Sequence, residues 1–203
     1  MSNSRGIAEL EVIRMEAQGC QRCELAESRG HVVFGEGRAD ANVFFIGEAP
    51  GRLEDEQGLP FVGRSGVLLR SLLADAGVAE EEVFITSVIK CRPPDNRDPK
   101  RDEISACSGW LEAQVQLIAP LLICTLGNFA LRLVRGDRAG ISSVHGVPEE
   151  REVFGHAALV LPLFHPAAAL RSTQTRSLLR DDIAQIPALL REAERQRSAS
   201  PSA

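Results

Sequence analysis

The sequence predicts an α/β fold of three layers, α/β/α, in which helices cover both faces of a central, mainly parallel sheet of four strands in a single domain. The first observation is that short apolar runs alternate with longer amphipathic segments, a pattern typical of parallel strands joined by helices. The second is that 203 residues, 44% of them hydrophobic, suffice for one domain with a substantial core, and no internal repeat divides the chain.

The expected elements follow in order along the chain. An amphipathic helix is expected at 7–17. Strands are expected at 42–47, 83–89, 121–126 and 158–164, the last broken or at an edge because of Pro162. Further helices are expected at 66–76, 102–118, 129–134 and 175–194, with a stop at Gly77 and a possible kink at Pro187. Residues 48–65 and 90–99 are expected to form loops, and 198–203 a disordered tail after a domain that spans 1–197.

Composition and charge exclude several classes of function. The net charge of -5 gives no overall basic signal for nucleic acid, so local charge has to identify a partner. There is no apolar run long enough for a transmembrane helix, and residues 1–6 lack the apolar core of a signal peptide. Five cysteines are an odd number, which fits a reducing compartment better than a disulfide framework. We therefore expect a cytoplasmic monomer with no membrane partner.

Four of the cysteines have the spacing of a metal site. Cys20 and Cys23 form a C-x2-C pair, and Cys91 and Cys107 follow with fifteen residues between them. Four thiolates suit either a structural Zn²⁺ or an iron–sulfur cluster. The fifth cysteine, Cys124, lies in an apolar run and is expected to be an inert core thiol.

Residues suited to chemistry follow the predicted strands. In a parallel sheet the ligand crevice lies beyond the carboxyl ends of the strands. The turn 47–51, the segment 87–92 and the pair His165-Pro166 all lie there, so we expect them to converge on one pocket. Amides of the first turn can hold a carbonyl oxygen or a phosphate, and His165 can donate to a developing anion. The alternatives are a plain β–α turn and a structural histidine.

Two other features suggest nucleic acid. Phe61, in a loop stiffened by Gly and Pro, is either a stacking platform for a base or an anchor in the core. Basic residues gather at 90–101 and 171–180, where they either contact phosphates or form ordinary solvated surface.

Together, the patterns G-E-A-P-G-x-x-E-D, G-x-P-F-V-G, K-C-R-P-P-x-N-R and H-P-A-A-A-L-R, with the four cysteines in place, resemble the family 4 uracil-DNA glycosylases, the iron–sulfur members of that superfamily. The resemblance covers nearly the whole chain, from Cys20 to Leu190. It implies a DNA repair enzyme that hydrolyses the N-glycosidic bond of deoxyuridine in single- or double-stranded DNA, leaving an abasic site. It also implies that Cys20, Cys23, Cys91 and Cys107 hold a 4Fe-4S cluster rather than Zn²⁺.

By position, the resemblance also assigns roles to residues of this chain. A uracil flipped out of DNA enters the crevice, where Gly47, Glu48 and Ala49 hold the base and the attacking water. Phe61 stacks on the ring, and His165 bonds uracil O2 as negative charge develops. The expected DNA contacts are Arg92, Arg97, Lys100 and Arg171, with Leu170 as a wedge in the minor groove.

Two positions depart from the related patterns. Ala49 stands where the best-known branch of the superfamily has an aspartate, so Glu48 and Asn96 are the candidates for activating water. Ser87 stands where family 4 typically has an asparagine that reads uracil O4 and N3–H, and a hydroxyl offers one donor at a time.

Three alternatives to a uracil-DNA glycosylase therefore stay open. They are a member that binds uracil-DNA with little turnover, a glycosylase with an altered base preference, and a non-enzymatic iron–sulfur sensor of DNA. The absence of a histidine from 97–100 argues against a relative that traps its substrate covalently.

Overall fold

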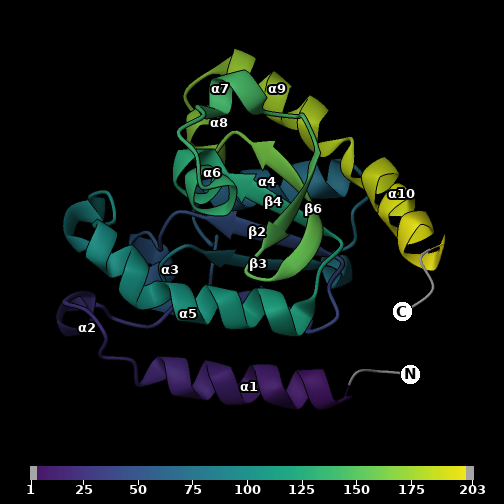
Figure 1. Cartoon of the computed structure of the whole chain (residues 1–203). Coiled ribbons are helices and arrows are strands. Elements are labelled where there is room, and N and C mark those ends of the chain that lie inside the picture. Colours follow the sequence, from purple (N-terminus) through teal and green to yellow (C-terminus); the bar gives the residue numbers. More distant parts are fainter. Residues whose placement is uncertain (1–3, 200–203) are drawn as a thin grey trace.

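The buried apolar runs form one mixed sheet of six strands in the order β1-β3-β2-β4-β6-β5 (Figure 1). The structure is a computed structural model that describes residues 4–199. Its strands are β1 (Glu36–Gly37), β2 (Val43–Gly47), β3 (Val83–Ser87), β4 (Leu122–Leu126), β5 (Glu149–Val153) and β6 (His156–Leu163). The four central strands β3, β2, β4 and β6 run parallel, while β1 and β5 pair antiparallel at the two edges.

The four predicted strands are therefore the four parallel ones. The predicted number of strands is too low, because the two edge strands β1 and β5 were not predicted. Neither edge carries the signal of a buried strand. β1 has only two residues, both exposed. In β5 the sequence is Glu-Glu-Arg-Glu-Val, and only Val153 is buried. Short or charged segments of this kind are typical of sheet edges.

Helices cover both faces of the sheet, as predicted. The longer ones are α1 (Ser4–Gln18), α4 (Arg64–Asp75), α5 (Arg101–Ile118), α6 (Gly127–Arg135), α9 (Thr173–Ile183) and α10 (Ile186–Ala199). The shorter ones are α2 (Leu25–Ser28), α3 (Arg52–Gln57), α7 (Ile141–Val144), α8 (Pro166–Ala169) and the 3₁₀ turns η1 (Glu80–Glu82) and η2 (Pro94–Asn96). Within residues 4–199, no helix has the length and apolar character that a membrane crossing needs.

Alternate side chains of each central strand reach opposite layers. In β2, Phe44 and Ile46 pack in the cluster that includes side chains of α1, α5 and α6. Val43 and Phe45 pack on the other face, with side chains of α4, α9 and α10. This alternation follows from the two-residue period of a strand and gives the α/β/α layering. Cys124 of β4 is fully buried in the second cluster, which confirms it as a core thiol.

Four local expectations need correction. The predicted loop 48–65 contains α3. The predicted helix 175–194 is two helices, because Pro187 lies in the first turn of α10 and has no N–H to continue α9. Pro162 does not break β6, since the pairing of β5 ends at Val160 and Pro162 needs no donor on that side. Of the predicted tail, residues 198 and 199 belong to α10, and 200–203 lie outside the described residues.

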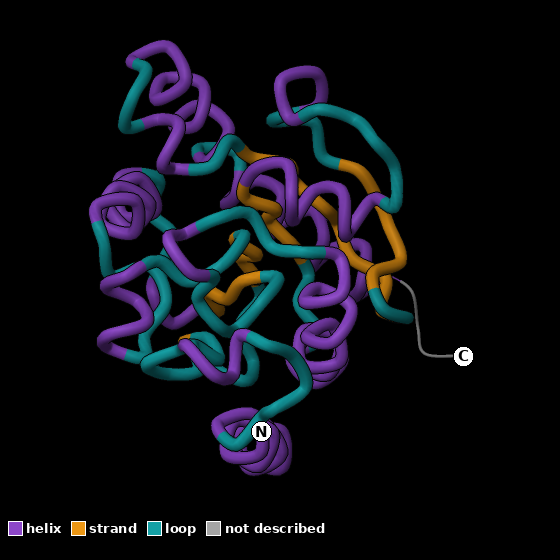
Figure 2. The backbone as a smooth tube through the Cα atoms, turned by 90° about the vertical axis from the view of Figure 1, so that its left-hand side faces the viewer, coloured by secondary structure: helices purple, strands orange, loops and turns teal. Residues whose placement is uncertain are grey.

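The ends of the parallel strands are surrounded by loops. Figure 2 shows this side of the molecule, with strand ends at the centre and loops and short helices around them. The loops that follow β2, β3 and β6 carry Glu48, Lys90–Asp98 and His165, so the topology brings segments that are far apart in sequence to one edge.

Candidate active site and cysteine cluster

A cleft of about 720 Å³ lies beyond the carboxyl ends of β2, β3 and β6, and the expected convergence of three segments is confirmed. Eight residues that the sequence marks as candidates line it together: Glu48, Ala49, Phe61, Ser87, Asn96, Arg97, His165 and Arg171. Four other candidates for contacts with the base or with DNA, Gly47, Arg92, Lys100 and Leu170, do not line it. The volume is in the range of small-molecule sites.

His165 is held as a neutral donor. The backbone N–H of Ala167 donates to His165 Nδ1 at 3.1 Å, so this nitrogen is an acceptor. In a neutral imidazole the other nitrogen, Nε2, then carries the hydrogen and is left to donate to a bound molecule. Burial lowers the pKa of His165 to about 4, which keeps the ring neutral near pH 7. His165 therefore has a structural contact at Nδ1 and a donor available for chemistry at Nε2.

Phe61 forms a wall of the cleft and is also part of the core. Its side chain is 8% exposed and packs with the apolar cluster beside α4, so the interpretation as a core anchor is confirmed, while stacking on a base stays a prediction. The ring lies against Gly47, where a Cβ atom would come within 2.7 Å of Phe61 Cζ. The centroid of the His165 ring is 6.0 Å away. Any side chain at position 47 would therefore displace the ring from the cleft.

Ser87 ends β3 in the floor of the cleft and is 4% exposed. No hydrogen bond to its hydroxyl is formed within residues 4–199, which leaves Oγ available to a ligand. Its backbone oxygen accepts from Lys90 Nζ at 2.8 Å. Lys90 is fully buried and also donates to Thr86 Oγ1 and Gln114 Oε1, and burial lowers its pKa to about 7. This network fixes the backbone that presents Ser87.

The two candidates for activating water are in different surroundings. Glu48 is half-buried, and its carboxylate makes no hydrogen bond or ion pair with the described part of the chain. Burial, followed by the charge of Asp98, raises the pKa of Glu48. Asn96 is exposed and its Oδ1 accepts from Arg92 Nε at 2.7 Å. The geometry therefore favours Glu48 as the group that is free to act on a water molecule.

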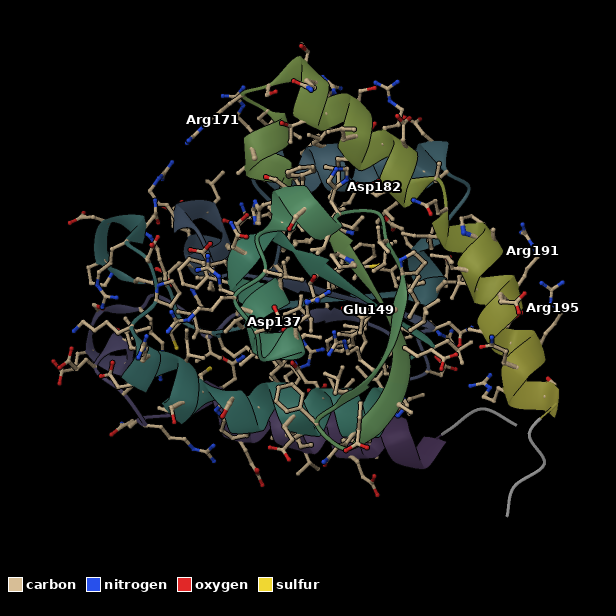
Figure 3. The ribbon with its side chains drawn as sticks, turned by 45° about the horizontal axis from the view of Figure 1, so that its top comes forward. Asp137, Glu149, Arg171, Asp182, Arg191 and Arg195 are labelled. Atoms are coloured by element: carbon tan, nitrogen blue, oxygen red, sulfur yellow. The ribbon has the colours of Figure 1, made fainter. Side chains whose placement is uncertain are left out.

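The predicted basic cluster is mostly engaged in contacts within the protein. Arg97 binds both carboxylate oxygens of Glu103, at 2.9 and 2.5 Å, and Lys100 binds Glu24 at 2.9 Å. Arg171 differs, since its guanidinium has no acidic partner among residues 4–199, and Figure 3 shows it extending away from the ribbon. Arg171 is thus the best placed of the predicted DNA contacts. The pair of Lys100 with Glu24 was not predictable from the sequence, because the two residues are 76 positions apart.

The four cysteines of the predicted metal site line one small cavity together with Arg22, Arg29 and Trp110. Three of the sulfurs accept hydrogen bonds. Trp110 Nε1 donates to Cys20 at 3.4 Å, the Lys90 N–H to Cys107 at 3.3 Å, and Arg29 Nη1 to Cys91 at 3.5 Å. Burial raises the pKa of Cys91 to about 11 and also raises that of Cys107. A bound cation would offset this effect and keep the thiolates ionised.

These residues fit a thiolate-bound metal centre. Cysteines from three separate segments meet there, and N–H groups directed at the sulfurs are the usual surroundings of such centres. Within residues 4–199, no group of three or more His, Cys, Asp or Glu side chains is placed to hold a metal ion as it stands.

The sequence analysis does not predict the roles of several residues that shape the site. Glu54 Oε1 accepts from the N–H of Gly63 at 2.8 Å and so fixes the loop that carries Phe61. Asp55 accepts from the N–H of Gly30 at 2.9 Å and connects α3 to the N-terminal segment. Both belong to the first motif, but a motif does not indicate the partner of an acidic side chain. Trp110 and Arg29 carried no signal at all.

Comparison with known proteins gives a consistent result. Residues 34–186 match the family model described as the uracil DNA glycosylase superfamily. A type-4 uracil-DNA glycosylase of Saccharolobus solfataricus is 42% identical over 87% of this chain and 84% of its own. One of Thermotoga maritima is 41% identical over 86% of this chain and 91% of its own. A type-5 uracil-DNA glycosylase of Pyrobaculum aerophilum is 41% identical, but over only 32% of this chain and 28% of its own.

Proposed function

The chain belongs to the uracil DNA glycosylase superfamily, and from this premise we propose that it is a repair enzyme that hydrolyses the N-glycosidic bond of deoxyuridine in DNA. The reaction releases uracil and leaves an abasic site. The observation that carries the proposal is the neutral His165, whose Nε2–H is left to donate in a cleft that also holds Phe61 and a free Glu48 carboxylate. This arrangement supplies a donor for the departing base, a surface for its ring and a group for water.

The bond breaks largely before water adds, so the site has to stabilise a positive sugar and a uracil anion. His165 Nε2–H donates to uracil O2, where negative charge develops, and a neutral donor does so without a proton transfer. The Phe61 ring packs on the base, and the amides of the 47–49 turn hold it. Glu48 orients the water and its negative charge favours the cationic sugar. Asn96, already bonded to Arg92, assists only in orientation.

The test of the proposal is release of the base from short oligonucleotides that contain one uracil or one thymine, single- and double-stranded. Free uracil and an alkali-labile abasic site support it. Tight binding without released base would favour the alternative of a binding protein, and release of another deaminated base would favour altered specificity. No binding and no release would contradict the proposal.

We also propose that Cys20, Cys23, Cys91 and Cys107 hold a 4Fe-4S cluster. The support is the family and the four thiols, which line one cavity together. The cluster would supply a structural tie between the N-terminal segment, the Lys90–Asp98 loop and α5. The substrate is DNA, and a monomer in the cytoplasm stays our expectation.

Glu48 predicts a dependence on pH. The carboxylate has to be ionised to act on water, and its pKa is raised by burial and by Asp98. Excision is therefore expected to fall as the pH decreases through this raised pKa. We assign this acidic limb of the pH–rate profile to Glu48, because His165, with a pKa of about 4, is still neutral in that pH range. Single-turnover rates measured from pH 4 to 8 test this. Asp98→Asn should shift the limb to lower pH, and a limb that Glu48→Gln leaves in place would assign it to another group.

Ser87→Asn is expected to raise excision of uracil. An amide can satisfy O4 and N3–H together, and a bidentate contact is worth about 1–3 kcal/mol of discrimination. The rate on uracil should rise by about fivefold at the low end of this range. Rates on oligonucleotides with uracil and with hypoxanthine provide the measurement, and Ser87→Ala is the control that removes the hydroxyl without adding an amide. A lower rate on uracil for the asparagine variant would show that this buried position is tuned to serine.

A further inference from the structure

A second groove lies beside the active-site cleft and has no role in the mechanism above. Its volume is about 520 Å³. Leu53, Val62, Val67 and Leu170 give it apolar walls, and Arg64 and Arg176 stand at its rim. Leu53, Val67 and Leu170 are 36%, 66% and 37% exposed, so three large apolar side chains face solvent in one place. Exposed apolar surface that gathers in this way is typical of a binding site.

The groove borders the cleft. Leu53 of the groove is followed by Glu54 of the cleft, and Leu170 of the groove is followed by Arg171 of the cleft. The Glu54 carboxylate also accepts from the N–H of Gly63, in the groove wall. The groove is therefore within reach of a DNA strand that leaves the cleft on this side.

The charges of the groove suit a polyanion. Arg64 and Arg176 are exposed, and neither has an acidic partner among residues 4–199. In contrast, Arg97 of the predicted basic cluster is paired with Glu103, and Lys100 is paired with Glu24. An unpaired guanidinium can bind a phosphate without first breaking an ion pair.

We propose that this groove binds the nucleotide next to the uracil in the same DNA strand. Its base packs on Leu53 and Val67, and its phosphates contact Arg64 and Arg176. Leu170 lies between the two sites, where it separates the extruded uracil from its neighbour. The proposal rests on the proposed function, since it requires DNA with a uracil in the cleft.

The test combines a groove variant with removal of the neighbouring base. Affinity is measured for single-stranded oligonucleotides that carry a non-hydrolysable deoxyuridine analogue, with either a normal or an abasic nucleotide on each side of it. The protein variant is Leu53→Ser together with Val67→Ser. Val12→Ser together with Val147→Ser is the matched control, because these valines are 55% and 60% exposed elsewhere on the molecule.

For the parent protein, loss of the base on one side of the analogue should weaken binding by about tenfold. For the groove variant the same loss should change affinity by less than about twofold, because the contact is already gone. The control variant should behave as the parent. Arg64→Ala and Arg176→Ala should each lower the log–log salt slope by about 1, whereas Arg97→Ala should not change it.

The proposal would be overturned if the groove substitutions and the loss of the neighbouring base weakened binding additively. It would also be overturned if the groove variant bound every oligonucleotide with unchanged affinity. The second result would leave the groove to a protein partner. Release of uracil is measured on the same samples. A protein that releases no uracil contradicts the proposed function, while normal release with no effect of the neighbouring base contradicts only the groove.

Discussion

Replacement of His165 with alanine is expected to lower the single-turnover rate of uracil excision by about 10²- to 10³-fold, the usual loss when a donor to a developing anion is removed. The reason is the geometry of the ring, because Nδ1 accepts from Ala167 and leaves Nε2–H as the donor. Affinity for uracil-DNA should change much less than the rate, since the contact strengthens only as charge moves onto the base.

The fold should survive this change. His165 caps the short helix α8, and loss of a cap costs about 1 kcal/mol, or about 2–4 °C in the midpoint of thermal unfolding for a domain of this size. His156→Ala is a matched control, since this histidine bonds Pro120 O at 2.8 Å and does not line the cleft. A His165→Ala protein that is unfolded, or one that keeps the full rate, would contradict the assigned role.

Cys91→Ser is expected to abolish the cluster and to destabilise the protein strongly. The parent should be brown, with a broad absorption near about 400 nm that is typical of thiolate-bound iron–sulfur centres. A structural metal site contributes to folding directly, and a loss of about 5 kcal/mol would lower the unfolding midpoint by about 10–20 °C. Absorption spectra, iron and sulfide analysis and thermal unfolding provide the measurements.

The fifth cysteine offers the control for this experiment. Cys124 is fully buried between strands and belongs to the core rather than to the cysteine cavity, so Cys124→Ala should keep the colour and the iron content. A colourless parent protein with one zinc ion per chain would show that the four ligands are right and the cluster is wrong. Iron that survives Cys91→Ser unchanged would contradict the ligand set itself.

The sequence predicts the parallel centre of the fold well, because each central strand is a short buried run followed by a turn. It predicts the edges poorly. β5 contains four charged residues in a row, and its pairing with β6 comes from chain reversal after Val153 rather than from burial. The short helix α3 was also missed, since its residues Arg-Leu-Glu-Asp-Glu-Gln show little apolar periodicity.

The candidate site was predictable where a residue follows a strand. Glu48, Ser87 and His165 meet in the cleft because the carboxyl ends of parallel strands lie at one edge of the sheet. The state of a charged side chain was not predictable in this way. Whether Arg97 is free or paired depends on the path of α5, which places Glu103 beside it. The sequence does not distinguish such a paired arginine from the unpaired Arg64 and Arg176 of the groove.

The two antiparallel edge strands also affect how this protein behaves at high concentration. An exposed edge of unpaired amides and carbonyls can recruit a strand from another molecule and start aggregation. Here one edge is two residues long, and the other exposes Glu150 and Glu152 on either side of Arg151. The edge at β1 is too short for a strand of a neighbouring copy to pair with. At β5, the glutamates of two copies would repel each other. We therefore expect the sheet itself to resist edge-to-edge self-association, independently of the DNA chemistry at its carboxyl end.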